Sequence, residues 1–393
     1  MTHRIYHDDA SLLSFHSTIK QWSRTTSGVV VVILEESAFY PESGGQMADH
    51  GSIDGFEVVD VQLGQEQEIE HHLKCDVQWE IGTKVQGQIS GTRRRQHRLL
   101  HTGQHLLSQA ALKTLGAKTI SSRLGETGCT LDLDIDSISE DEVSQLLDVV
   151  HDVIDEHRPI RCYFPDEETL RALELRRSSK VDKNIRVVDV EGYDVTPCGG
   201  THCENTAEVG LVHVFRVERI RQNVRLCFDA GARARARLLQ NHHWMSQLVE
   251  PLNASDAGIV DAVMRIRREA DAHKKEILQL EKRWAKAVTD KMEIENGWAI
   301  LVVKEANAQA LLLLSQGILL ETDAHTLCLF SPSETHGQLL LRSRGDVDCR
   351  QILKCITEEF GGNGGGKPEQ AQGKTPANLP FSSLMKRIQQ ERQ

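Results

Sequence analysis

The sequence predicts an α+β protein built from several domains, and three features of the 393-residue chain support this prediction. Residues 1–90 contain short apolar runs separated by glycines, which is the pattern of a small β-barrel. Residues 91–240 mix helix and strand patterns, which indicates an α+β domain. Residues 241–296 are expected to form a helical linker, and residues 297–393 a small α/β domain. Two to four domains are expected at this length.

Two strands are predicted within the barrel segment. Val29–Leu34 is apolar and β-branched, and Phe56–Leu63 alternates in part between apolar and polar residues. The turns around them are marked by glycines, namely Gly51, Gly55, Gly64, Gly82 and Gly91. Short strands with turns between them favour a closed barrel.

Two helices and several strands are predicted in the α+β domain. The first helix covers Arg94–Leu115, because no proline interrupts Gln96–Leu115 and its leucines are spaced for burial on one side. The second helix covers Ser139–His157, where Ser139 and Glu142 form a capping-box pattern. The predicted strands are Thr130–Ile135, Ile160–Phe164, Ile185–Val190 and Gly210–Arg216.

Two further helices are predicted after the α+β domain. The first covers Ala232–Val249 and is expected to end at Pro251. The second carries apolar residues at alternating spacings of four and three, the pattern of a coiled-coil seam. Its seam positions are Ile259, Val263, Ile266, Ala270, His273, Ile277, Leu280, Trp284 and Ala287. This seam suits either a hairpin with the preceding helix or a homodimer.

The last domain is expected to contain strands at Trp298–Val303 and Thr326–Phe330, with a leucine-rich helix between them. Gly361–Gly366 cannot be the interior of a helix, because glycine loses the most backbone entropy there. Its consecutive amides suit a phosphate or the edge of a ribose. A flexible linker is the alternative interpretation.

Composition indicates a cytoplasmic protein. The chain is 39% hydrophobic and 26% charged, as in ordinary globular proteins. Nine cysteines, an odd number without framework spacing, indicate a reducing compartment. The first residues lack a signal-peptide pattern, and the longest apolar runs, Val29–Leu34 and Leu311–Leu320, are too short to span a membrane.

The charge distribution decides how the net charge of −11 is interpreted. The net value argues against a nucleic-acid partner, but phosphate binding depends on local cationic surface. Seven arginines lie between Arg216 and Arg237, and another basic run covers Arg93, Arg94 and Arg95. Such runs are either solvated faces or nucleic-acid contacts. We assign the second run to a nucleic-acid surface, because it directly precedes a predicted metal site.

That metal site is predicted from two stretches about ninety residues apart. His101 and His105 are four residues apart on the predicted helix, so both imidazoles lie on one face. Cys198 and His202 flank a glycine turn that can direct both side chains at one point. Three imidazoles and one thiolate suit tetrahedral Zn²⁺. The alternatives are histidines without a metal, or Cys203 in place of Cys198.

These stretches carry a resemblance to a known family. The motifs HTGQHLL at residues 101–107 and PCGGTHCENTAEVG at 197–210 resemble the editing domain of alanyl-tRNA synthetase, and more closely the freestanding AlaX proteins. FYPESGGQ at residues 39–46 is similar to the glycine-rich loop of the longer AlaX proteins, and NVRLCFDAG at 223–231 to the strand after the ligand turn. GGNGGGKPEQAQG at residues 361–373 resembles the C-terminal domain of the synthetase.

The resemblance implies a zinc-dependent hydrolase that edits mischarged tRNA(Ala) in trans. Serine is the expected amino acid and glycine the second, since a synthetase built for alanine excludes neither well. No counterpart of the aminoacylation domain is identified, so charging of tRNA is not implied. Two alternatives stay open, namely editing of Ser-tRNA(Thr) and a non-catalytic module that binds tRNA or a synthetase and carries a structural zinc.

Site roles follow from the same resemblance. Gln46 is expected to place a water or hold the substrate, although a tight turn that closes a hairpin is the alternative interpretation of its loop. Thr102, Thr201 and Glu42 are weaker candidates for hydrogen bonding near the metal. The C-terminal domain is expected to grip tRNA through Gly364, Gly365, Gly366 and Lys367. Whether all four ligands bind zinc at once, and which group activates water, stays open.

Overall fold

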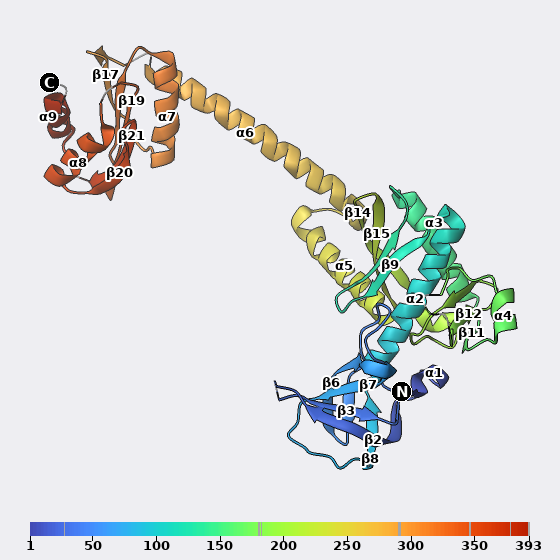
Figure 1. The fold of residues 1–393 in the computed structure, drawn as a ribbon. Helices are drawn as coiled ribbons and strands as arrows, with labels where there is room; N and C mark the ends of the chain where they lie inside the picture. The colour runs from blue at the N-terminus through green and yellow to red at the C-terminus, as the bar shows by residue number, and fades with distance from the viewer. Residues whose placement is uncertain are drawn as a thin grey trace. The chain divides into compact units, whose positions relative to one another are not determined.

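The computed structural model describes residues 1–26, 28–179, 181, 183–289, 292–345, 347–377 and 379–391. The chain divides into two compact units, residues 1–247 and 248–393. The first unit contains a closed β-barrel and an α+β part, and the second contains a long helix and an α/β part (Figure 1). None of the helices in the described ranges has the length and apolar character that a membrane span requires.

The barrel closes in the strand order β2-β3-β7-β6-β5-β8, as the glycine-punctuated pattern predicts. Its strands are β2 (Ser14–Arg24), β3 (Val30–Leu34), β5 (Gly51–Ile53), β6 (Phe56–Leu63), β7 (Ile69–Leu73) and β8 (Lys84–Ile89). Alternate residues of β7 and β8 are buried, which fills the barrel interior. A short strand β1 (His3–Arg4) pairs in parallel with β4 (Glu36–Ser37), and α1 (Ile5–Asp8) follows β1.

The α+β part is organised around helix α2 (Gly91–Leu115). A four-stranded antiparallel sheet has the order β14-β15-β10-β9, and a three-stranded sheet the order β11-β12-β13. The elements are β9 (Thr119–Leu124), β10 (Cys129–Leu133), α3 (Glu140–Asp155), β11 (Ile160–Tyr163), α4 (Glu167–Ala172), β12 (Val187–Val190), β13 (Asp194–Pro197), β14 (Val212–Ile220) and β15 (Asn223–Ala230). The sequence analysis did not predict β9, β13 or α4.

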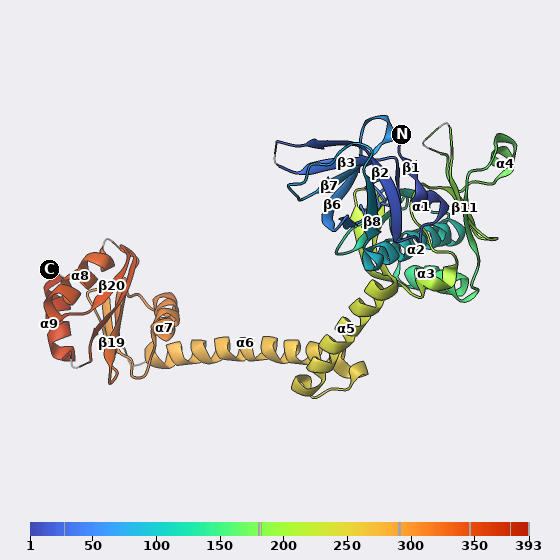
Figure 2. The same ribbon diagram turned by 90° about the horizontal axis from the view of Figure 1, so that it is seen from below.

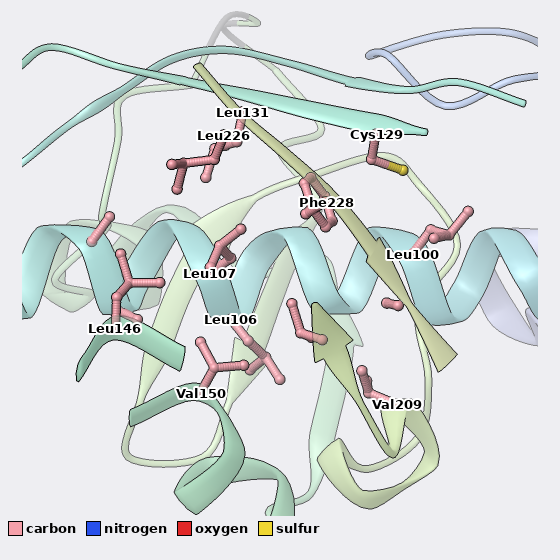
Figure 3. Close-up of a cluster of buried hydrophobic side chains, with 14 of the residues drawn as sticks. Leu100, Leu106, Leu107, Cys129, Leu131, Leu146, Val150, Val209, Leu226 and Phe228 are labelled. Atoms are coloured by element: carbon pink, nitrogen blue, oxygen red, sulfur yellow. The ribbon is translucent and has the colours of Figure 1, made fainter. Parts of the chain in front are cut away.

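The hydrophobic core of this part packs both sides of α2. Figure 3 shows Leu106 and Leu107 of α2 between strand residues such as Phe228 and helix residues such as Val150. The predicted cap of α3 is present, since the side chain of Ser139 accepts from the N–H of Glu142 and the capping box is complete. This packing holds α2 rigid, so residues on its polar face have defined positions.

Helix α5 (Gly231–Leu252) runs past Pro251, which was expected to end it. A proline removes one helical hydrogen bond, and in the last turn little helix remains to be disrupted. Arg233 and Arg237 on α5 both pair with the buried carboxylate of Asp229 on β15. The start of α5 is thereby anchored to the four-stranded sheet.

The predicted heptad helix is α6 (Ile259–Thr289). Its seam is exposed in this chain at Val263, Ile266, Ile277, Leu280 and Trp284, with 36–55% of each residue accessible. The homodimer is one of the two arrangements considered for this seam, and it stays a proposal.

The α/β part of the second unit has a six-stranded sheet in the order β16-β17-β18-β19-β21-β20. Its elements are β16 (Ile294–Glu295), β17 (Trp298–Val302), α7 (Ala308–Glu321), β18 (Thr326–Ser331), β19 (His336–Ser343), α8 (Cys349–Phe360), β20 (Asn363–Lys367), β21 (Gln370–Pro376) and α9 (Phe381–Glu391). Figure 2 shows α7 on one face of this sheet and α8 and α9 on the other. Strands β17 and β18 are parallel and α7 connects them, as the strand, helix and strand patterns predict. The glycine run forms the edge strand β20, so the linker interpretation is wrong.

Candidate functional site

The two predicted metal stretches meet in the first unit. Among the described residues, the potential ligand atoms of His101, His105, Cys198 and His202 all lie within 4.8 Å of one another. The sulfur of Cys198 is 3.4 Å from Nε2 of His101 and 3.4 Å from Nε2 of His202. A zinc tetrahedron with ordinary Zn–N and Zn–S bonds has edges of roughly 3.3–3.6 Å. The four residues therefore fit a zinc ion.

The backbone permits this approach because of one glycine in the turn. A Cβ atom on Gly200 would lie 2.2 Å from Cε1 of His101, so a larger residue would displace that imidazole. Arg186, which precedes β12, also holds the turn in place. Its guanidinium donates to the carbonyls of Cys198 and Gly200 at 3.1 and 2.9 Å. The ligand turn is therefore held in place independently of any ion.

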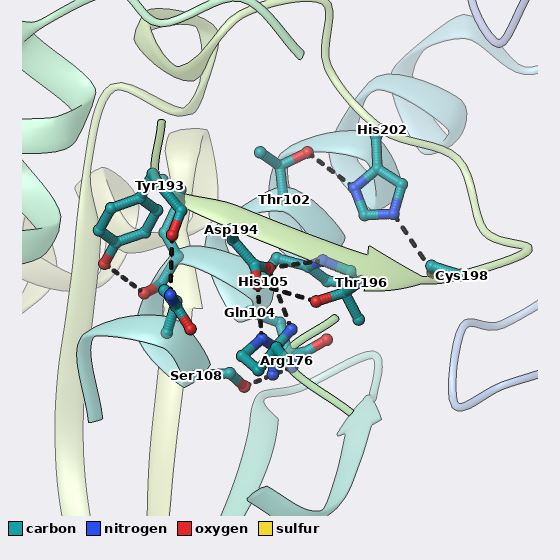
Figure 4. A network of polar contacts seen from close by, with 12 residues as sticks. Thr102, Gln104, His105, Ser108, Arg176, Tyr193, Asp194, Thr196, Cys198 and His202 are labelled. Carbon is teal, nitrogen blue, oxygen red and sulfur yellow. Dashed lines mark hydrogen bonds and ion pairs between the residues drawn. The ribbon is translucent and has the colours of Figure 1, made fainter. Parts of the chain in front are cut away.

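Each histidine of the cluster is oriented through its Nδ1 atom. Nδ1 of His101 donates to Oε1 of Gln46 at 2.8 Å, and Nδ1 of His202 lies 3.3 Å from Oγ1 of Thr102 (Figure 4 shows the second contact). Nδ1 of His105 lies 3.4 Å from Oδ2 of Asp194, an ion-pair distance longer than an ordinary hydrogen bond. The Nε2 atoms are thus left for the metal, as is usual for histidine ligands.

Asp194 is a site residue that the sequence analysis missed. Its carboxylate accepts from Nε and Nη2 of Arg176 at 2.8 and 3.1 Å and from Oγ1 of Thr196 at 2.8 Å (Figure 4). Burial would raise the pKa of Asp194, but His105 and Arg176 outweigh it and lower the pKa to about 2. The carboxylate is therefore charged and can fix the orientation of His105. Its position four residues before Cys198 is the only signal in the sequence.

Replacing Asp194 with asparagine is expected to weaken zinc binding by about 10–100-fold, the usual cost of losing a partner of a metal-bound histidine. The amide keeps the shape but not the charge that stabilises His105 as a ligand. Competition with a chromophoric chelator measures the zinc dissociation constant. Asp189→Asn, on the adjacent strand and outside the cluster, is the matched control and should bind zinc like the unchanged protein. Equal zinc affinity in both variants would contradict the assigned role of Asp194.

The electrostatics at Cys198 and His202 favour the protonation states that bind metal. At His105, burial alone would lower the pKa of the imidazole, but the neighbouring carboxylate of Asp194 outweighs it and raises the pKa. Burial alone would raise the pKa of the Cys198 thiol, but His101 and His202 outweigh it and hold the pKa well below its usual value. Burial lowers the pKa of His202 well below its usual value. A thiolate and a neutral imidazole are the forms that coordinate metal ions. Burial raises the pKa of Cys203 to about 12, and Cys203 lies outside the cluster, which agrees with the choice of Cys198.

Gln46, expected to act on water or the substrate, lies behind the candidate ligands. So do Thr102 and Thr201, which were expected to form hydrogen bonds near the metal. Gln46, Thr102 and Thr201 are each fully buried. Nε2 of Gln46 donates to Oγ1 of Thr201 at 2.9 Å, and the N–H of Thr201 donates back to Oε1 of Gln46 at 3.1 Å. Oγ1 of Thr102 accepts from the N–H of Cys203 at 3.1 Å. In this arrangement all three residues position the ligands, whereas Glu42 is exposed on the protein surface.

A pocket of about 840 Å³ opens onto the cluster. His101 and Cys198 form part of its wall, together with Gln104 of α2 and Ser122 of β9. The pocket also has a cationic lining, which consists of Arg4, Arg177, Lys183 and Arg186. None of Gln46, Thr102 and Thr201 is among the described residues that line it. A ligand in this pocket would therefore meet two of the four metal ligands and a positive field.

The basic run before the metal site is only partly a surface. Arg94 is 1% exposed, and its guanidinium pairs with buried Asp49, so its assignment to a nucleic-acid surface is wrong. A helix that docks on the barrel buries this position, which the run of like charges does not indicate. Arg93 is partly exposed and donates to the carbonyl of Ala48 at 2.8 Å. Arg95 is exposed.

The glycine run of the second unit also differs from the expected cradle. Gly364 and Gly366 pair with residues of β21, so one edge of this strand is already hydrogen-bonded. Gly365, Gly366 and Lys367 line a separate pocket of about 770 Å³, and Arg342 and Arg344 line it as well. Three of the four predicted contact residues therefore lie at a cationic pocket, and all four belong to an edge strand in place of a free loop.

Three family models match the chain. The Threonyl and Alanyl tRNA synthetase second additional domain matches residues 185–226, which include Cys198 and His202. A model for tRNA synthetases class II (A) matches residues 4–93, which form the barrel, and the DHHA1 domain matches residues 295–391.

The chain is similar to alanine–tRNA ligases of archaea. It is 31% identical to that of Archaeoglobus fulgidus over 391 residues, which cover 95% of this chain and 42% of the relative. It is 29% identical to that of Ignicoccus hospitalis over 384 residues, which cover 94% of this chain and 41% of the relative. The chain thus spans about two fifths of the length of these relatives.

A solved structure, the C-Ala domain of Aquifex aeolicus alanyl-tRNA synthetase, aligns with 26% of this chain and 96% of its own length. It is 18% identical with a TM-score of 0.24, too low to say anything about the fold. Two of the family models and the ligase relatives all name tRNA synthetases, so the comparison does not depend on this structure. The chain is therefore similar to alanyl-tRNA synthetases and carries segments that match the second additional domain and the DHHA1 domain.

Proposed function

We propose that the protein is an aminoacyl-tRNA deacylase that hydrolyses mischarged tRNA(Ala) in trans, mainly Ser-tRNA(Ala) and secondarily Gly-tRNA(Ala). The observation that carries this proposal is the zinc-type cluster of His101, His105, Cys198 and His202, two of whose members line a pocket of about 840 Å³ with a cationic lining. A pocket of this size and charge suits the aminoacylated end of a nucleic acid. The similarity to alanine–tRNA ligases directs the choice of tRNA.

The pocket wall offers partners for a serine hydroxyl. Gln104 lies on α2 between His101 and His105, and its Nε2 donates to Oγ of Ser108 at 2.7 Å. This contact fixes the amide while its side chain lines the pocket. Ser122 lines the pocket from β9. A polar wall of this kind favours serine over alanine, because a buried group left without a hydrogen bond lowers the affinity for the smaller amino acid.

In the hydrolysis, the oxygen of a water attacks the ester carbonyl carbon, and the bond to the ribose oxygen breaks to leave serine and intact tRNA. When bound, zinc would supply a positive charge that orients the α-amino group or polarises the ester carbonyl. Gln46, Thr102 and Asp194 hold the three imidazoles in place. Because Gln46 and Thr102 do not line the pocket, we assign activation of the water to the neighbouring hydroxyl of the terminal ribose.

The body of the tRNA would contact cations in both units. Arg93 and Arg95 lie near the metal site on α2, and Arg95 is exposed. In the second unit, Lys367 and the edge strand glycines Gly364, Gly365 and Gly366 would bind backbone phosphates, together with Arg342 and Arg344 of the adjoining pocket. The exposed heptad seam of α6 would serve a homodimer. Nine unpaired cysteines agree with action in the reducing cytoplasm.

A second candidate is a non-catalytic module that binds tRNA or a synthetase. The observation in its favour is the number of ligands, because a set of four protein ligands is typical of a closed structural zinc site. Editing of Ser-tRNA(Thr) is a third candidate, because the matching domain is shared with threonyl-tRNA synthetases. The alanine–tRNA ligase relatives favour tRNA(Ala) over tRNA(Thr).

A deacylation assay separates these candidates. The zinc-loaded protein is expected to hydrolyse Ser-tRNA(Ala) at least about 100-fold faster than Ala-tRNA(Ala), because only serine can satisfy the polar wall of the pocket. Release of labelled amino acid from each tRNA gives the rates, and Ser-tRNA(Thr) is included for comparison. Equal background loss from all three tRNAs would refute the editing function and leave the binding module. Faster loss from Ser-tRNA(Thr) would change the assigned tRNA.

A further inference from the structure

Three buried nitrogen atoms on the pocket wall have no hydrogen-bond partner within residues 1–26, 28–179, 181 and 183–289. They are Nε of Arg4, Nε2 of His7 and Nε of Arg186. All three residues line the same pocket as His101 and Cys198. A buried polar atom without a partner destabilises the protein, and more so when the group is charged. Three such atoms in the lining of one pocket indicate a ligand that supplies the missing partners.

Contacts within the protein hold these three side chains in place. Nη2 of Arg4 donates to Oε1 of Gln67 at 2.7 Å. Arg186 is 5% exposed, and its Nη1 donates to two carbonyls of the ligand turn. The ring of His7 lies 4.6 Å from that of Tyr6, centroid to centroid. The unpartnered atoms therefore belong to fixed side chains that cannot turn away to find water at little cost.

The charge around these atoms selects an anion. Arg4, Arg177, Lys183 and Arg186 line the pocket, and Asp8 is the one acidic residue among its described lining. The carboxylate of Asp8 lies 3.4 Å from Nε2 of His3, so it is already paired when His3 is protonated. This local excess of cations stands in a chain whose net charge is −11. A guanidinium N–H binds an anionic oxygen more strongly than a neutral one.

An aromatic surface lies next to His7 in the same pocket. Phe164 is 50% exposed and lines the pocket, and its ring centroid is 5.6 Å from that of His7. An exposed aromatic ring beside cations is the combination that binds a base and a phosphate of single-stranded nucleic acid.

We propose that Arg4, His7 and Arg186 form an anion subsite that holds the phosphate of the terminal nucleotide of the acceptor strand, with its base against Phe164. This subsite deepens the proposed function and rests on it for the identity of the nucleic acid. It gives the segment before the barrel a role, since β1 and α1 contribute Arg4 and His7 to the lining of the pocket. The terminal ribose, which carries the amino acid, would then lie between the phosphate and the metal cluster.

The test measures binding of adenosine 5′-monophosphate and of adenosine to the zinc-loaded full chain by calorimetry. The monophosphate is expected to bind at least about 10-fold more tightly, because charge-assisted hydrogen bonds to its phosphate add to the contacts of the nucleoside. Arg4→Gln should reduce this preference to less than about twofold. Arg171→Gln, which changes an exposed arginine of α4 away from the pocket, should keep the preference. Zinc content and the unfolding temperature establish that Arg4→Gln is folded.

The outcomes separate the subsite from the proposed function. Equal affinity for both ligands, or a folded Arg4→Gln protein that keeps the full preference, would overturn the subsite even if Ser-tRNA(Ala) is hydrolysed. A preference lost only in Arg4→Gln supports the subsite even if no tRNA is hydrolysed. If the protein is active, Arg4→Gln should raise KM by about 10-fold and change kcat by less than about twofold, because it removes binding and leaves the metal cluster intact. A fall in kcat alone would overturn the assignment.

Discussion

Cys198→Ala is expected to abolish deacylation and to weaken zinc binding by more than about 100-fold. Losing a residue that only orients a metal ligand costs up to about 100-fold in metal affinity, and losing a ligand itself should cost more. Cys198 is the one sulfur in the cluster, and its thiolate neutralises half the charge of the ion. Without it, three neutral imidazoles would hold zinc in a buried site. Metal analysis after dialysis and the Ser-tRNA(Ala) assay measure the two losses.

The matched control for this prediction is Cys203→Ala. Cys203 is close in sequence, also buried, and outside the cluster, so its variant should keep zinc and activity. Removal of zinc with a strong chelator should reproduce the Cys198→Ala result in the unchanged protein, and added zinc should reverse it. A Cys198→Ala protein with full zinc content and full rate would overturn the ligand assignment.

Arg94→Met is expected to lower the free energy of unfolding by about 3–5 kcal/mol, which is the usual cost of breaking a buried ion pair from one side. Arg94 and Asp49 are 1% and 0% exposed. Nε of Arg94 donates to Oδ2 of Asp49 at 3.0 Å, and Nη1 donates to the carbonyl of Ala10 at 2.9 Å. The substitution would leave the Asp49 carboxylate charged and buried without its cation. Urea unfolding followed by tryptophan fluorescence gives the difference.

Two further variants make this prediction specific. Arg95→Met changes the exposed neighbour and should alter the free energy of unfolding by less than about 0.5 kcal/mol. The double variant Arg94→Met, Asp49→Asn should lose less than Arg94→Met alone, because no buried charge is left unpaired. A stability like that of Arg95→Met in the single Arg94 variant would contradict a structural role for the pair.

The ion pair also connects stability to the site. Asp49 follows the glycine-rich turn that ends at Gln46, and the N–H of Leu124 donates to the carbonyl of Gly45 at 2.8 Å. Gly45 has a φ of +87°, and a Cβ atom there would lie 2.6 Å from the carbonyl oxygen of Ser122. The loop therefore packs directly on β9 and carries Gln46 to His101. This explains why a loop of the barrel contributes to a metal site on a helix of another part of the first unit.

The fold could be predicted where its signals are local. Helix α2, the capping box of α3 and the strand, helix and strand of the second unit each follow from the periodicity or the residues of one short segment. Strands β9 and β13 were not predicted, because their formation depends on pairing with strands elsewhere in the chain. Thr119–Leu124 has two serines and an arginine among its six residues, and its place in the sheet depends on pairing with β10.

The sequence by itself predicted the cluster of candidate metal ligands, because helical spacing brings His101 and His105 to one face and the glycine turn brings Cys198 to His202. Only the tertiary structure decided what surrounds them. It buried Arg94 against Asp49, put Gln46 behind His101 and brought Asp194 to His105. It also placed Arg4 and Arg186 in the lining of one pocket. The physical reason is that spacing along a helix or turn depends on neighbouring residues, whereas contacts between distant segments depend on how whole elements pack. The sequence does not indicate whether the packing directs a given polar side chain toward a ligand or toward another residue.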